Sequence, residues 1–87
     1  MTRHELKVWP EPFSAVWDGI KLFEIQQEAD RKFEVGDELV LNCWDPERER
    51  YTDDPSLECT VSYVARGPDW GLPDGMVVMS LESVRSL

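Results

Sequence analysis

Short segments of alternating apolar residues, separated by turns, constrain the fold of this chain most strongly. Apolar side chains occupy every second position in 38–44 (ELVLNCW) and 57–65 (LECTVSYVA), and residues 4–9 (HELKVW) repeat the pattern over a shorter span. A period of two places one face of a strand in the core and the other toward solvent. Residues 76–81 (MVVMSL) are apolar on both faces, as expected of a strand covered on both sides. With a further strand over 21–26, these segments predict a mostly β fold.

One short helix is predicted before these strands. Apolar residues recur at i, i+3, i+4 and i+7, at Phe13, Val16, Trp17 and Ile20. Pro10 and Pro12 suit a helix entry, and Gly19 suits the residue that follows its last turn. The pattern predicts a helix over 13–18 with Trp17 in the core.

At 87 residues the chain is expected to form a single domain, 1–87, with a small core. Five or six short strands and one early helix favour a small, curved, mostly antiparallel β-barrel of the α+β type. The inward positions are expected to be Leu39, Leu41 and Cys43 on one strand, and Leu57, Cys59, Val61, Tyr63 and Ala65 on another. Both cysteines should therefore be buried and reduced.

Charge and composition narrow the classes of function. The net charge of −9 opposes binding to a long phosphate backbone, because that affinity comes largely from Lys and Arg. The charge is compatible with binding of small ligands or of basic protein partners. A single histidine, His4, and no clustered Cys/His spacing give no support for a metal, and no cofactor is expected. The segment MTRHELKVWPEPF has no apolar signal region, and no run approaches a membrane span, so a cytoplasmic protein is expected.

Four segments together resemble a known family. HELKVWPEPFSAVWDGIKLFEI, DRKFEVGD, WDPERERYT and GLPDGMVVMSLE are similar to an uncharacterised bacterial and phage branch of the ASCH family, within the PUA-like superfamily. The similarity covers nearly the whole chain. It implies a small β-barrel with a helix beside a cleft, and a role in binding RNA or modified nucleosides. Some ASCH members are amidohydrolases that act on acetylated cytidine.

The segment from helix to strand both matches and departs from the ASCH pattern Gly-x-Lys-x-x-(Thr or Glu)-x-Arg. Gly19 and Lys21 match, Glu24 takes the fourth position, and Gln26 replaces the usual arginine. The amidohydrolases use a threonine nucleophile at the Glu24 position, and a carboxylate cannot act as a hydroxyl nucleophile. The residues after YT, usually Gly-Arg, are two aspartates here, at positions 53 and 54. The resemblance therefore favours binding over catalysis.

Lys21 and Glu24 are the main site candidates, together with Gln26. Their odd spacing would point the first two to opposite faces of an ideal strand, unless Lys21 lies in the preceding junction or a bulge turns it. If they converge over a desolvated cleft, they could hold a nucleobase edge or activate water. Otherwise they form a solvated ion pair worth about 0 to 1 kcal/mol. Both interpretations stay open.

Exposed aromatic and basic residues supply further candidates. Trp9, Trp44 and Trp70 could stack on bases, or could plug loops over a small barrel. Arg31 could touch a phosphate, or could offset neighbouring acids. His4 could act as a general base, but a lone terminal histidine is more often a surface residue.

The sequence leads to three alternative hypotheses for the function. The leading hypothesis is a non-enzymatic module that binds RNA or a nucleoside in a small cleft. The second is an acidic phage-type protein that mimics DNA and occupies a basic site on a host nucleic-acid enzyme. The third is a hydrolase of modified nucleosides in which Lys21 and Glu24 activate water.

Overall fold

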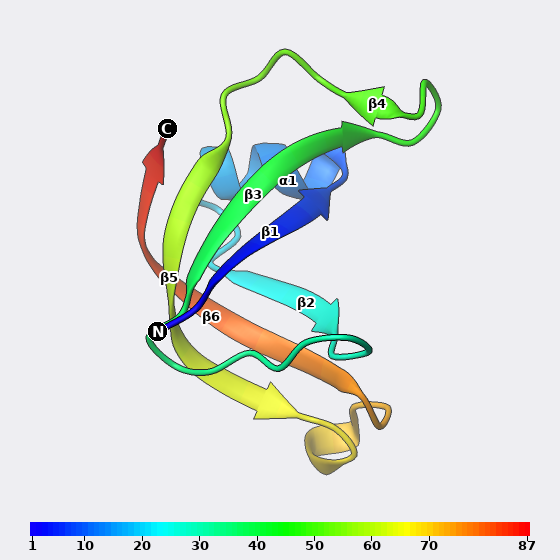
Figure 1. Ribbon diagram of the computed structural model, residues 1–87, viewed down its shortest axis with the longest axis vertical. Coiled ribbons are helices and arrows are strands. Elements are labelled where there is room, and N and C mark those ends of the chain that lie inside the picture. The colour runs from blue at the N-terminus through cyan, green and yellow to red at the C-terminus, as the bar shows by residue number, and fades with distance from the viewer.

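The computed structural model describes residues 1–87 and shows a mostly β fold with one short α-helix (Figure 1). Its elements are β1 (Arg3–Val8), α1 (Pro10–Trp17), β2 (Phe23–Gln27), β3 (Glu38–Asp45), β4 (Arg50–Tyr51), β5 (Leu57–Arg66), a 3₁₀ turn η1 (Asp69–Gly71) and β6 (Met76–Ser86). The predicted mostly β class with one short early helix is thus confirmed, and each predicted strand segment overlaps an observed strand, whereas closure into a barrel stays a prediction. No helix has the length and apolar character needed to cross a membrane.

The strands form one curved sheet whose two edge strands border the candidate site around Lys21 and Glu24. Their order is β1-β3-β5-β6-β2, with β4 pairing with β3 as a short hairpin. β1 runs parallel to β3, and the other pairs are antiparallel, so the sheet is mixed. The parallel pair arises because α1 and β2 intervene between the two strands, as a parallel connection requires. β1 and β2 are the edge strands of the main sheet, and they diverge on the right of Figure 1.

The helix begins earlier in the chain than predicted, and fewer of its apolar side chains are buried than the pattern predicts. It starts at Pro10, whose missing N–H costs nothing in the first turn, and it packs on β3. Phe13 and Val16 are buried, but Trp17 is 47% exposed, so the prediction that Trp17 lies in the core is wrong. A helix of two turns presents only a narrow face to the sheet, and Trp17 lies at its rim.

The inward register is confirmed on β3 and on the first half of β5. Leu39, Leu41, Cys43, Leu57, Cys59 and Val61 are all buried. The prediction fails at Tyr63, which is 61% exposed, because an irregularity in the β5–β6 pairing lies between Val61 and Tyr63. The bulge shifts the alternation by one residue, so that Val64 packs against the core instead.

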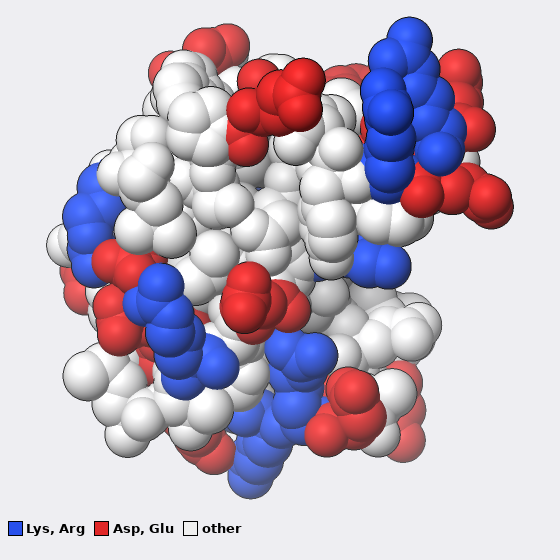
Figure 2. Space-filling view, turned by 45° about the horizontal axis from the view of Figure 1, so that its top comes forward, with Lys and Arg blue, Asp and Glu red and all other residues white.

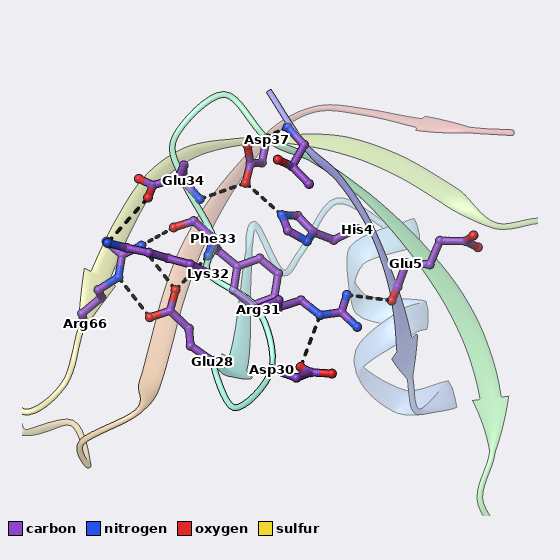
Figure 3. Close-up of polar contacts among 11 residues, drawn as sticks. His4, Glu5, Glu28, Asp30, Arg31, Lys32, Phe33, Glu34, Asp37 and Arg66 are labelled. Carbon is purple, nitrogen blue, oxygen red and sulfur yellow. Dashed lines mark hydrogen bonds and ion pairs between the residues drawn. The ribbon is translucent and has the colours of Figure 1, made fainter.

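The loop between β2 and β3 plugs the core with Phe33, which is buried with the residues of the sheet. Glu28 accepts hydrogen bonds from Arg66 Nε (3.0 Å) and from the Phe33 N–H (2.8 Å), and Arg66 also donates to the Phe33 carbonyl (Figure 3). Burial alone would raise the pKa of Glu28, but the hydrogen bonds from Arg66 and Phe33 hold it below its ordinary value.

A buried carboxylate, Asp37, fixes the other end of this loop (Figure 3). Its Oδ2 lies 2.8 Å from His4 Nε2, and it accepts N–H bonds from Thr2 and Glu34, both at 3.0 Å. The His4 ring packs on Phe33, with centroids 4.6 Å apart. The expectation that His4 lies on the surface is therefore wrong: a lone histidine gives no sequence signal for a buried carboxylate partner far along the chain.

Asp37 should make stability sensitive to acid. Burial would raise its pKa, but the hydrogen bonds from His4, Thr2 and Glu34 together lower it. This stabilisation is present above the unfolded-state value, about pH 4, and is lost as pH falls through the lower folded-state pKa. We expect Asp37→Asn to cost about 1.5 to 3 kcal/mol at pH 7 and to lose less stability than the parent between pH 4 and pH 2.

Urea denaturation across this pH range tests the prediction. Asp30→Asn, an exposed change in the same loop, is the matched control and should stay within about 0.5 kcal/mol of the parent. Equal stability of Asp37→Asn and the parent at pH 7, or the same acid slope in both, would contradict the role given to Asp37.

Cys43 and Cys59 are both free and buried, as predicted. Burial raises the pKa of the Cys59 thiol to about 11, which disfavours the reactive thiolate. We expect an aromatic disulfide reagent to label both thiols slowly in the native protein and rapidly in denaturant. Fast native labelling, or a mass two units low that reveals a disulfide, would refute this.

Candidate functional site

A hollow of about 270 Å³ lies between the ends of β1 and β2, beside the start of α1. Its walls are formed by Lys7, Val8, Trp9, Pro12, Lys21, Glu24, Ile25 and Gln26. Four of the seven predicted ligand residues, Trp9, Lys21, Glu24 and Gln26, are therefore together in one place. In Figure 2 the outline of the molecule is notched on the right, the side on which β1 and β2 diverge in Figure 1.

Lys21 and Glu24 converge in this hollow. Glu24 belongs to β2 and is paired with the buried Met79, so its side chain points to the inner face of the sheet and is only 5% exposed. Lys21 precedes β2, in the junction after Gly19, where strand alternation does not apply. Its Nζ lies 2.6 Å from Glu24 Oε1 and donates a further hydrogen bond to the Phe23 carbonyl (2.6 Å).

The end of the helix holds this junction in place. The N–H groups of Ile20 and Lys21 both donate to the Ala15 carbonyl of α1, at 2.9 and 3.0 Å. Gly19 has φ +74°, a conformation that only glycine adopts without strain. The Gly-x-Lys spacing therefore brings the lysine back over the carboxylate.

The ion pair keeps some hydrogen-bonding capacity for a ligand. Gln26 Nε2 lies 3.4 Å from Glu24 Oε2, so each carboxylate oxygen has a protein donor. The Lys21 ammonium has three protons and two protein acceptors, which leaves one proton for another group. The Lys21 side chain is 17% exposed, so that proton can reach the hollow.

A second lysine, Lys7, borders the hollow and was not among the sequence candidates. Its Nζ lies 3.9 Å from the centre of the Trp44 ring and 6.0 Å from that of Tyr51. The two rings pack edge to face, with centroids 4.9 Å apart. Trp44 thus supports Lys7 and does not itself line the hollow. Only the parallel pairing of β1 with β3 brings these residues together, and no local pattern reveals it.

Three predicted aromatic and basic candidates have different surroundings. Trp9, at the N-terminus of α1, is 61% exposed and forms one wall of the hollow. Trp70 lies in η1 between β5 and β6, exposed and apart from the hollow-lining residues. Arg31 donates to the Glu5 carbonyl (3.3 Å) and lies 3.6 Å from Asp30, so it holds the β2–β3 loop against β1 (Figure 3).

The hollow contains a limited set of chemical groups. No group of three or more His, Cys, Asp or Glu side chains could hold a metal ion. The lining also contains no hydroxyl or thiol side chain. Its reactive or binding groups are two ammonium ions, a carboxylate, an amide and an indole.

Residues 3–81 match a family described as "Domain of unknown function (DUF3850)". The matched span includes every residue that lines the hollow. No curated protein matches the chain.

The contribution of the Lys21–Glu24 ion pair to the free energy of unfolding can be measured with variants. We expect Lys21→Met to destabilise the protein by about 3 kcal/mol, because Glu24 is left buried without its cation. The double variant Lys21→Met/Glu24→Gln should recover most of this loss, since the remaining amide carries no charge.

Lys32→Met is the control, because Lys32 forms an exposed ion pair with Glu34 in the β2–β3 loop. Urea denaturation should place this control within about 0.5 kcal/mol of the parent. If Lys21→Met is no less stable than Lys32→Met, the Lys21–Glu24 pair is solvated and the site described here does not hold.

Proposed function

Because the chain belongs to the DUF3850 family, whose description names no activity, we propose from the site itself that the protein is a non-enzymatic module that binds a nucleoside or a short RNA element. The ligand would occupy the hollow between β1 and β2. One observation carries the proposal: a buried carboxylate, paired at 2.6 Å with a partly exposed lysine, faces a hollow with an exposed indole wall.

These groups suit the chemistry of a nucleobase. Glu24 can accept a hydrogen bond from an exocyclic amine, and Lys21 can donate to a ring nitrogen or carbonyl. Trp9 offers a flat surface for stacking, an interaction worth about 1 to 3 kcal/mol per base. The volume of about 270 Å³ is slightly below the roughly 300 to 1,000 Å³ of pockets for drug-sized ligands, which suits a base with its sugar at the mouth. The resemblance to the ASCH family supports the same class of ligand.

Local charge also supports a small nucleic-acid ligand. The chain carries a net charge of −9, but the hollow has two lysines and one glutamate. Contact with a nucleotide is therefore electrostatically favourable here and unfavourable over most of the surface. Such a ligand would be bound at one point and not along an extended backbone.

DNA mimicry is a weaker proposal. Its support is the net charge and the exposed Asp53 and Asp54 after β4. Figure 2 shows acidic and basic side chains interspersed on the visible face, without the two parallel acidic rows that would imitate a duplex. A hydrolase acting through water is weaker too, because Glu24 is held by Lys21 and the hollow supplies no hydroxyl nucleophile.

Calorimetric titration with a panel of the four ribonucleosides and acetylated cytidine tests the proposal. We expect one of them to bind, and Lys21→Ala to weaken binding by about 1.5 to 3 kcal/mol through loss of a charge-assisted hydrogen bond. Lys32→Ala removes an exposed lysine outside the hollow and should leave the affinity unchanged.

Asp53→Asn/Asp54→Asn should also leave nucleoside binding unchanged. Binding that survives Lys21→Ala in a folded protein would refute the site. No nucleoside binding, together with salt-sensitive capture of a host DNA-binding enzyme that weakens in the Asp53/Asp54 variant, would establish mimicry instead.

A further inference from the structure

We infer that Lys7 is a phosphate contact, so that the hollow takes a phosphorylated nucleotide in preference to the corresponding nucleoside. This inference rests on the proposed function and specifies its ligand. It assigns separate roles to the two lysines of the hollow.

The first observation is that Lys7 has no carboxylate partner. Seven of the nine Lys and Arg side chains form an ion pair within 4.0 Å, and only Lys7 and Arg50 do not. The chain contains eighteen acidic residues, twice the number of basic ones, so an unpaired lysine beside the hollow is unusual. Its charge is not neutralised by a neighbouring acid.

The second observation is that Lys7 is nevertheless held in place. The parallel register pairs Lys7 with Asn42, which puts Trp44 on the same face two residues further along β3. The ammonium lies over the Trp44 ring at 3.9 Å, in the range where a cation is attracted to an aromatic face. An aromatic ring restrains the ammonium without taking its charge, and its protons stay available for a stronger acceptor.

The third observation is that Lys21 cannot take this role. Its charge is matched by the buried carboxylate of Glu24 at 2.6 Å, and two of its protons are already used. An arriving phosphate would be repelled by Glu24 at that position. Lys21 and Glu24 therefore suit the neutral base, and Lys7 suits the anionic group attached to its sugar.

Lysine binds phosphate as a compact point charge, and a charge-assisted hydrogen bond is about twice as strong as a neutral one. The phosphate could belong to a free mononucleotide or to the end of a short RNA. The net charge of −9 disfavours any longer contact with a phosphate backbone. Both sources share the chemistry of one phosphate beside Lys7, and the experiment separates them.

The first experiment compares a nucleoside, its 5′- and 3′-monophosphates and a ribotrinucleotide at two salt concentrations. We expect one monophosphate to bind at least tenfold more tightly than the nucleoside at low salt. Lys7→Gln should abolish this preference and its salt dependence, and should weaken nucleoside binding much less than it weakens monophosphate binding. Arg50→Gln is the matched control, because Arg50 is the other unpaired cation but does not line the hollow. This variant should change neither the nucleoside affinity nor the monophosphate affinity.

The trinucleotide separates the two sources of the phosphate. A trinucleotide that binds no more tightly than the monophosphate identifies a free nucleotide as the ligand, and tighter binding identifies an RNA end.

Equal affinity for nucleoside and monophosphates would overturn the inference and leave the proposed function intact. A Lys7→Gln variant that weakens nucleoside and nucleotide equally would also overturn it, because Lys7 would then only support the fold. Absence of binding by every ligand would remove the inference together with the proposed function.

A second probe does not depend on the nucleoside site. The chain has only three lysines, Lys7, Lys21 and Lys32, so ¹³C labelling at Cε gives three resolvable signals. Titration with inorganic phosphate should shift the Lys7 signal most, and Lys7→Gln identifies that signal by its loss. A larger shift at Lys21 or Lys32 would contradict the assignment of Lys7 as the anion contact.

Discussion

Buried carboxylates determine how this small domain is joined together, because each one must receive a cation or several hydrogen bonds. Asp37 is bonded to His4 and ties the N-terminus to the β2–β3 loop. Glu58 lies between Arg3 and Arg85 and links β1, β5 and β6 across the outer face of the sheet. Glu24 is paired with Lys21. No buried side-chain polar atom is left without a partner. The first two carboxylates are used entirely within the fold, whereas Glu24 faces a hollow that is open to solvent.

The position of that hollow follows from the order of the strands. β1 and β2 are the two ends of the main sheet and diverge beside α1. Phe33 and Arg31 from the β2–β3 loop close one part of this region, by burial in the core and by contact with β1. The other part stays open and is lined by the ends of three elements. Its charged groups are already held by protein partners, Lys21 by Glu24 and Lys7 by the Trp44 ring, and such pre-organisation lowers the cost of binding.

The sequence predicted the fold well where the pattern is local, and the site only partly. Alternation located the strands. The Gly-x-Lys-x-x-Glu segment supplied Lys21 and Glu24 as candidates, but only the structure shows that they converge, because Lys21 lies in the junction before β2. Local patterns cannot reveal which strands are neighbours, so the parallel β1–β3 pair, and with it the contact of Lys7 with Trp44, was not foreseen. The bulge that exposes Tyr63 and the burial of His4 beside Asp37 depend on partners far along the chain. For the same reason the sequence offers Arg31, Trp44 and Trp70 as ligand residues although none of the three lines the hollow.

We propose that the ligand binds in the hollow between β1 and β2. Mapping of backbone amide chemical shifts during titration with nucleoside monophosphates tests it most directly, because it locates binding without assuming which residues matter. We expect the largest shifts in residues 7–9 and 21–26, with smaller changes in Trp44 and Tyr51 through Lys7. Shifts centred on η1 near Trp70, or on the acidic residues 45–54, would show that binding occurs elsewhere and would contradict it.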